Sequence, residues 1–151
     1  IDVCRALDPQ HLDTAVPGTY GSILETQRHL VGADSWYLFD TSRQGTPPAS
    51  VDQMDLSALR IAMVSNGTGW SEFLRADLDP DVVLREVDPD DGYEKLAPVG
   101  IRLAQVLHHG TDHRSQICTA LTSLGVEPPA IDAWDFGAQD GRVVEVFPPT
   151  S

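Results

Sequence analysis

The chain has 151 residues, 41% of them hydrophobic, and its 23 acidic and 10 basic residues give a formal net charge of -13. This length and composition fit one domain, residues 1–151, with a substantial core, and they exclude wholesale disorder. The negative charge excludes nucleic acids and anionic membrane surfaces as partners, because Lys and Arg supply most of the affinity for both.

The first predicted helix is short, covering residues 1–7 and ending before Asp8-Pro9. We therefore expect that the N-terminal part of this helix lies outside the present numbering. Ser22 and Glu25 match a capping box, which predicts that a second helix begins there and extends to about Asp40. Apolar residues recur at helical spacing along this second helix: Ile23, Leu30, Ala33 and Tyr37.

A loop over residues 44–50 separates the second helix from a third, which is predicted over residues 54–77. Within the third helix, the Asn-Gly-Thr-Gly stretch at residues 66–69 favours a kink or a break. Residues 82–87 then mix apolar and polar positions. That mixture is typical of a short strand, or of one arm of a hairpin whose other arm is residues 92–96.

The last long helix is predicted from Pro98, which suits a first helical turn, to Leu124, with Gly125 as its C-cap. The tail, residues 126–151, is expected to be packed irregular chain that frays at its end. Taken together, these elements predict an all-α fold, with a short β-hairpin arm as an option between the third and fourth helices.

The sequence opens with no signal peptide and contains no apolar run long enough to span a membrane. Two cysteines, Cys4 and Cys118, are too few for a disulfide framework and are expected to be reduced thiols. These features together favour a cytoplasmic protein.

Two of the five histidines, His109 and His113, lie four residues apart on the last helix, so both imidazoles can reach one ion. Both lie at the edge of the apolar face of that helix, and His29 lies at the edge of the apolar face of the second helix. Helices that carry histidine beside an apolar face can build a metal site between them. The alternative is a hydrogen-bonded boundary histidine at each position, because this spacing also arises by chance. His108 and His11 are expected to be solvated.

Residues 18–37, which include His29, resemble the second-helix motif of the DinB/YfiT-like family. Residues 108–117, HHGTDHRSQI, resemble the later motif of the same family, H-x-x-x-H-R-G-Q, with Ser115 at the position of its usual glycine. Residues 124–136 also fit the family pattern.

The resemblance implies a four-helix bundle, often a homodimer, in which three histidines hold one divalent metal ion, zinc or nickel. At the matching positions the ligands are His29, His109 and His113. Characterised relatives include S-transferases and an isomerase that use a low-molecular-weight thiol such as mycothiol or bacillithiol. The resemblance therefore implies a metal that ionises such a thiol for attack on a small electrophile. Two alternatives stay open: a metal-dependent hydrolase and a non-catalytic metal-binding protein of a stress response.

Further residues are candidates for the pocket or for contacts with the ligands. Gln116 and Arg114 could orient a substrate or the metal ligands, although a structural salt bridge is the more frequent role for an arginine placed like Arg114. Trp36 could line the pocket or belong to the core. Asp112 could ligate the metal or accept an imidazole N–H, although its position on the helical wheel lies to one side and disfavours direct contact with the metal. Cys118 is expected to be an inert buried thiol that faces away from the histidines.

Overall fold

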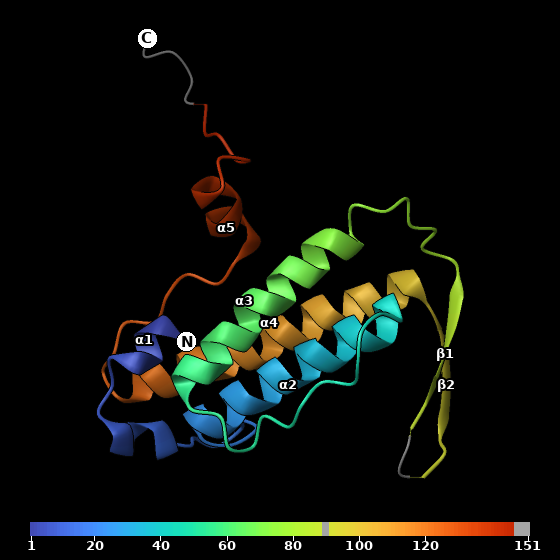
Figure 1. The fold of residues 1–151 in the computed structure, drawn as a ribbon. Helices are drawn as coiled ribbons and strands as arrows, with labels where there is room; N and C mark the ends of the chain where they lie inside the picture. Colours follow the sequence, from blue (N-terminus) through green and yellow to red (C-terminus); the bar gives the residue numbers. More distant parts are fainter. Residues whose placement is uncertain (89–90, 147–151) are drawn as a thin grey trace.

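The computed structural model describes residues 1–88 and 91–146, and its main body is a bundle of helices (Figure 1). A one-turn helix and a 3-10 helix lie at one end of the long helices, and an antiparallel hairpin lies at the other end. The predicted helical bundle is confirmed, with its first helix reduced to a single turn. The helices are α1 (Asp2–Arg5), η1 (Pro9–Asp13), α2 (Ile23–Ser42), α3 (Leu56–Phe73), α4 (Val99–Ser123) and α5 (Ala133–Gln139).

Helix α2 begins at the predicted capping box. The Ser22 hydroxyl accepts a hydrogen bond from the backbone N–H of Glu25 at 3.3 Å, and the Glu25 carboxylate accepts one from the backbone N–H of Ser22 at 2.8 Å. The two bonds satisfy donors that the first turn of a helix leaves without intrahelical partners. The box therefore fixes where α2 starts and the position of His29 along it.

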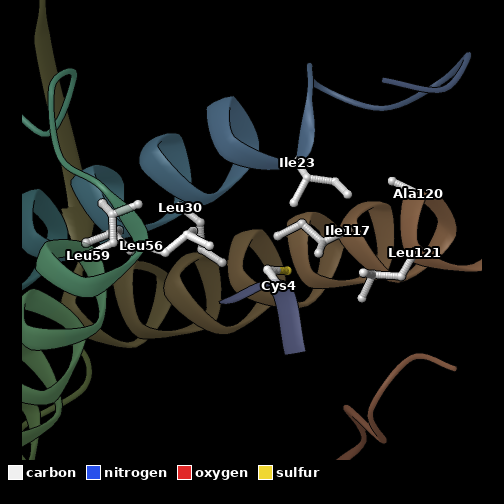
Figure 2. Close-up of a cluster of buried hydrophobic side chains, with 9 residues drawn as sticks. Cys4, Ile23, Leu30, Leu56, Leu59, Ile117, Ala120 and Leu121 are labelled. Carbon is white, nitrogen blue, oxygen red and sulfur yellow. The ribbon is translucent and has the colours of Figure 1, made fainter. Parts of the chain in front are cut away.

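The apolar core lies between α2, α3 and α4 and includes Cys4 of α1 (Figure 2). Ile23 of α2 and Leu121 of α4 are each 1% exposed, and Leu59 of α3 is fully buried. Burying a side chain of this size contributes about 1.5–3 kcal/mol relative to leaving it in water. The buried members are Cys4, Ile23, Leu30, Val31, Leu56, Leu59, Ile117, Ala120 and Leu121.

Helix α3 departs from prediction, because it runs without a break through residues 66–69 and ends at Phe73 instead of residue 77. Asn66 is buried, and its side-chain amide donates to the carboxylate of Asp34 on α2 at 2.8 Å. At Gly69, an added Cβ would lie 2.6 Å from a methyl group of Leu38. Asn66 and Gly69, two of the residues that suggested a kink, therefore serve the close packing of α3 against α2.

The option of a hairpin between the third and fourth helices is confirmed by strands β1 (Val83–Val87) and β2 (Glu94–Pro98), which pair antiparallel with Glu86 opposite Lys95. The hairpin is attached to the helices by polar contacts. Glu86 accepts a hydrogen bond from the indole N–H of Trp36 at 3.2 Å, and Arg102 of α4 lies 3.4 Å from Glu86. Arg102 also forms a buried ion pair with Asp40 at the end of α2.

Both ends of α4 match the prediction within one residue. Pro98 is the N-cap residue instead of a first-turn residue, and Gly125 follows the C-cap with a φ of 73°, a left-handed conformation that glycine adopts without strain. Within the described residues, no helix is both long and apolar enough to cross a membrane.

The prediction of a packed irregular tail is wrong for residues 133–139, which form α5. The carboxylate of Asp132 caps this helix by accepting the backbone N–H groups of Trp134 and Asp135. Helix α5 projects away from the bundle (Figure 1), and Trp134 and Phe136 are 76% and 66% exposed. The predicted fraying concerns residues 147–151, which lie outside the described residues.

Replacing Asp40 by alanine is expected to lower the free energy of unfolding by about 3–5 kcal/mol, because the buried Arg102 guanidinium would lose its closest anion. Urea unfolding of the purified variant measures this loss. The matched control is Asp2→Ala, which removes the exposed pairs of Asp2 with Arg60 and Arg5 and should leave the free energy of unfolding nearly unchanged. Equal losses in the two variants would contradict the assigned role of the buried pair.

Candidate metal centre

Three imidazoles from two helices converge on one point of the bundle. His29 comes from α2, and His109 and His113 come from α4. One ring nitrogen of each lies within 4.8 Å of the others, and the Nε2 atoms of His29 and His109 are 3.1 Å apart. Two nitrogens bound to one tetrahedral zinc ion lie about 3.3 Å apart. The cluster can therefore hold a metal ion after small side-chain adjustments.

The environment of His29 and His109 favours the neutral form of these two imidazoles, which is the form that binds metals. His29 and His109 are half-buried, and His113 is 6% exposed. Burial, together with the nearby His113, lowers the pKa of His29 and of His109 below the ordinary value of 6.5. Lone pairs on these rings are therefore available at neutral pH.

Within the described residues, no fourth histidine, cysteine, aspartate or glutamate joins the cluster. Structural zinc sites commonly have four protein ligands, whereas catalytic sites have three and leave one position for water or substrate. The donor set thus matches the open type of site.

Gln116 holds one of the imidazoles through its side-chain oxygen. This oxygen lies 3.1 Å from Nδ1 of His113 and accepts the backbone N–H of Tyr20 at 2.8 Å. The side-chain nitrogen of Gln116 donates to the Asp112 carboxylate at 3.2 Å. An oxygen acceptor at Nδ1 selects the tautomer that carries its proton there, which leaves Nε2 of His113 as the metal-binding atom.

Asp112 takes neither of the two direct roles considered for it, metal ligand or acceptor of an imidazole N–H. It is exposed, lies outside the histidine cluster and accepts its hydrogen bond from Gln116 instead of from an imidazole. Its hydrogen bond connects it to His113 through Gln116, and its charge also acts on His109 by raising the pKa of that imidazole.

Two tyrosines enclose the imidazoles. The ring of Tyr20 stacks on His29, with centroids 4.0 Å apart and planes inclined by 18°, and it meets His113 edge-on at 5.4 Å. Tyr37 meets His109 edge-on at 5.5 Å. The rings restrict the orientations that the ligands can adopt. Tyr20 is itself 57% exposed, so it lies between the cluster and solvent.

A cavity of about 770 Å³ lies beside the cluster, bounded by α2 on one side and by residues 48–52 on the other. His29, Tyr20 and Tyr37 line it, and so does Trp36, which places that predicted pocket residue at the cavity and not in the apolar core. A cavity of this volume is large enough for a small organic ligand. The complete lining is Tyr20, Gly21, Glu25, Arg28, His29, Gly32, Ala33, Trp36, Tyr37, Pro48, Ala49, Ser50, Val51 and Asp52.

Arg114 lies at a second cavity of about 380 Å³, which is bounded by α2, α3 and α4 and also touches His109 and Asp34. The predicted salt bridge of Arg114 is wrong: its guanidinium donates to the Thr111 hydroxyl at 3.0 Å, and no ion pair of Arg114 occurs among residues 1–88 and 91–146. Burial lowers the pKa of Arg114 and raises that of Asp34.

The other singled-out residues lie apart from the cluster. His108 is exposed, as expected, whereas His11, also expected to be solvated, is half-buried on η1. Cys118 is half-buried at a third cavity, away from the histidines, and burial raises the pKa of its thiol. Cys4 and Cys118 are both free thiols.

Sequence reasoning missed Tyr20, Arg28 and Glu25 as residues of the site. Glu25 lies four positions before His29, so helical periodicity places it on the same face. Arg28 directly precedes His29 and points about 100° away from it, so periodicity gave no signal for its place at the cavity. Tyr20 precedes the helix, and its contact with His29 depends on the turn at residues 18–21, for which the sequence offers no comparable signal.

Comparisons with known proteins bear on the family and the fold of this chain. The model of the DinB family matches residues 1–142. The structure is similar to the crystal structure of a DinB-like protein from Bacillus cereus ATCC 10987, with a TM-score of 0.66 and 15% sequence identity over 87% of each chain. No curated protein matches the sequence.

Replacing Gln116 by leucine is expected to weaken zinc binding at the cluster by about 10- to 100-fold, because His113 would lose the acceptor that orients its ring. Competition with a chromophoric chelator measures the dissociation constant. The control is Gln105→Leu, since Gln105 contacts the Tyr37 hydroxyl at 3.5 Å and no histidine of the cluster. Unchanged zinc affinity in Gln116→Leu would show that the ring of His113 is held by packing alone.

Proposed function

The chain belongs to the DinB family, and on this premise we propose that its three histidines hold one divalent metal ion and that the protein transfers a low-molecular-weight thiol to a small electrophile. The observation that carries the proposal is the open three-histidine cluster beside a cavity of about 770 Å³. A structural metal would need neither the vacancy nor the cavity.

The chemistry of the donor set supports zinc or nickel as the ion. His29, His109 and His113 would hold it through neutral nitrogens, so the protein would not cancel its charge. Bound there, such an ion would lower the pKa of an approaching thiol and thereby supply a thiolate nucleophile at neutral pH.

The residues around the cluster would position the two substrates. Tyr20, Trp36 and Tyr37 offer apolar surfaces along the cavity that bring the thiol and the electrophile to the His29 side of the cluster. In the transfer a new S–C bond forms at the electrophilic carbon. The electron pair of the broken bond leaves with the displaced group, and the proton of the thiol passes to solvent.

The hydrolase alternative has less support. Hydrolysis calls for a general base beside the attacking water. Glu25 lines the cavity, but its carboxylate accepts the backbone N–H of Ser22, a contact that holds the pKa of Glu25 below its ordinary value of 4.5. It is therefore a weak base. Asp52 also lines the cavity, but its carboxylate already accepts the Ser50 hydroxyl at 2.8 Å. Asp112 lies outside the residues that line the cavity.

The homodimer that the resemblance implies stays a prediction, as does a cytoplasmic location. The free thiols of Cys4 and Cys118 support a reducing compartment.

Elemental analysis of the purified protein is expected to find one divalent ion per chain. Each of His29→Ala, His109→Ala and His113→Ala should lose it, because two imidazoles hold a divalent ion much less tightly than three. The matched control is His108→Ala, which removes an exposed histidine next to a ligand and should retain full occupancy. Full occupancy in any of the three ligand variants would disprove the assigned site.

The metal-loaded protein is expected to transfer a cysteine-containing thiol to chlorodinitrobenzene. The absorbance of the thioether product measures the rate. In His113→Ala the rate should fall by about 100-fold or more, because the thiol would lose its means of ionisation. The His108→Ala variant should match the wild type. If the protein binds stoichiometric metal but does not accelerate transfer of any thiol, it would instead be a non-catalytic metal-binding protein.

A further inference from the structure

We propose that the 770 Å³ cavity beside His29 binds a thiol that carries a carboxylate, and that Arg28 is the residue that binds this carboxylate. The inference rests on the proposed thiol transfer and specifies which class of thiol the site accepts. Three observations carry it: the unused donors of Arg28, the arrangement of residues along α2 and the charges of the cavity wall.

Arg28 is half-buried and has donors to spare. Its Nε atom donates to the backbone carbonyl of Met54 at 3.0 Å, which fixes the side chain between α2 and the chain that leads into α3. Among the residues that the structure describes, neither of its two terminal nitrogens has a hydrogen bond or an ion pair. A guanidinium held in this way presents N–H groups in a planar fork, the arrangement that binds carboxylates in bidentate fashion.

The cavity follows one face of α2, and His29 lies between its charged and aromatic parts. Arg28 and Trp36 both line it, and eight helical residues separate them by about 12 Å. Gly32 and Ala33 lie between and form a low floor. At Gly32 a Cβ would come within 2.9 Å of Val51, so any side chain there would crowd the opposite wall. Because Arg28 and His29 are neighbours on α2 and both line the cavity, a short ligand can place its carboxylate at Arg28 and its thiol beside His29.

Arg28 provides the positive charge that an anionic ligand would need in this cavity. Within the described part of the chain, it is the one lysine or arginine that lines this cavity, whereas Glu25 and Asp52 line it with negative charge. Both carboxylates have donors of their own: Glu25 accepts from Ser22 N–H, and Asp52 accepts from the Ser50 hydroxyl at 2.8 Å. The chain as a whole carries a net charge of -13. A carboxylate ligand is therefore repelled by most of the molecule and attracted locally at Arg28.

The test compares two thiols of equal size, N-acetylcysteine, which carries a carboxylate, and N-acetylcysteine amide, which does not. Isothermal titration calorimetry with the zinc-loaded protein measures the dissociation constant of each. The wild type is expected to bind the carboxylate form about tenfold more tightly, as one charge-assisted hydrogen bond supplies. Arg28→Gln should lose this preference, and Arg28→Lys should keep part of it because the charge remains.

Arg114→Gln is the matched control, because it removes a second arginine near the histidines that faces the other cavity. It should keep the wild-type preference. Equal binding of the two thiols by the wild type, or a preference that survives Arg28→Gln, would overturn the inference and leave the proposed function standing. A general loosening of the cavity wall in Arg28→Gln would weaken both thiols alike and would also overturn it. Failure of the wild type to bind either thiol would overturn the proposed function itself.

Discussion

The packing of α2 against α4 is the constraint on which the candidate site depends. His29 and His109 are 80 positions apart in the chain, yet their Nε2 atoms lie 3.1 Å apart because the two helices are held together on both sides of them. Toward α1, buried apolar side chains such as Ile23 and Ile117 join the helices (Figure 2). Toward the hairpin, the buried ion pair of Asp40 and Arg102 does so. A close-packed interior transmits small shifts, so the ligand geometry depends on both attachments.

The polar contacts around the histidines keep the nearby carboxylates of Asp112 and Glu25 out of direct contact with the ligands. Asp112 reaches His113 only through the neutral amide of Gln116, and Glu25 is engaged at the start of α2. An ion bound by three neutral imidazoles would keep its full charge, which is the condition for activating a ligand. The distant excess of negative charge, -13 for the chain, still attracts cations toward the molecule. Attraction at long range and neutrality at short range are thus compatible.

The hairpin contributes to the wall of the cavity as well as to the fold. Glu86 on β1 accepts the indole N–H of Trp36, and Trp36 lines the cavity that His29 also lines. Burial opposes ionisation of Glu86, but the hydrogen bond from Trp36 and the nearby Lys95 and Arg102 outweigh it and lower the pKa of Glu86. The carboxylate therefore stays charged at neutral pH. The hairpin at the end of the bundle thus fixes the side chain of Trp36 next to the candidate metal centre.

The sequence by itself determined the local features of this protein. The capping box at Ser22, the glycine after α4 and the four-residue spacing of His109 and His113 are all written in residues close together in the chain, so helical geometry alone interprets them. The same local reasoning failed at residues 66–69, where Asn66 bonds to Asp34 and Gly69 admits Leu38 instead of ending the helix. It also failed at α5, whose capping residue Asp132 was overlooked.

Only the tertiary structure decided what lies around the histidines. The stacking of Tyr20 on His29, the chain from Asp112 through Gln116 to His113 and the free donors of Arg28 depend on how segments far apart in sequence meet. Helical periodicity says which face a side chain is on, but it does not say which partner from another segment that face will meet. That choice is made by the packing of the helices, to which every buried side chain contributes at once.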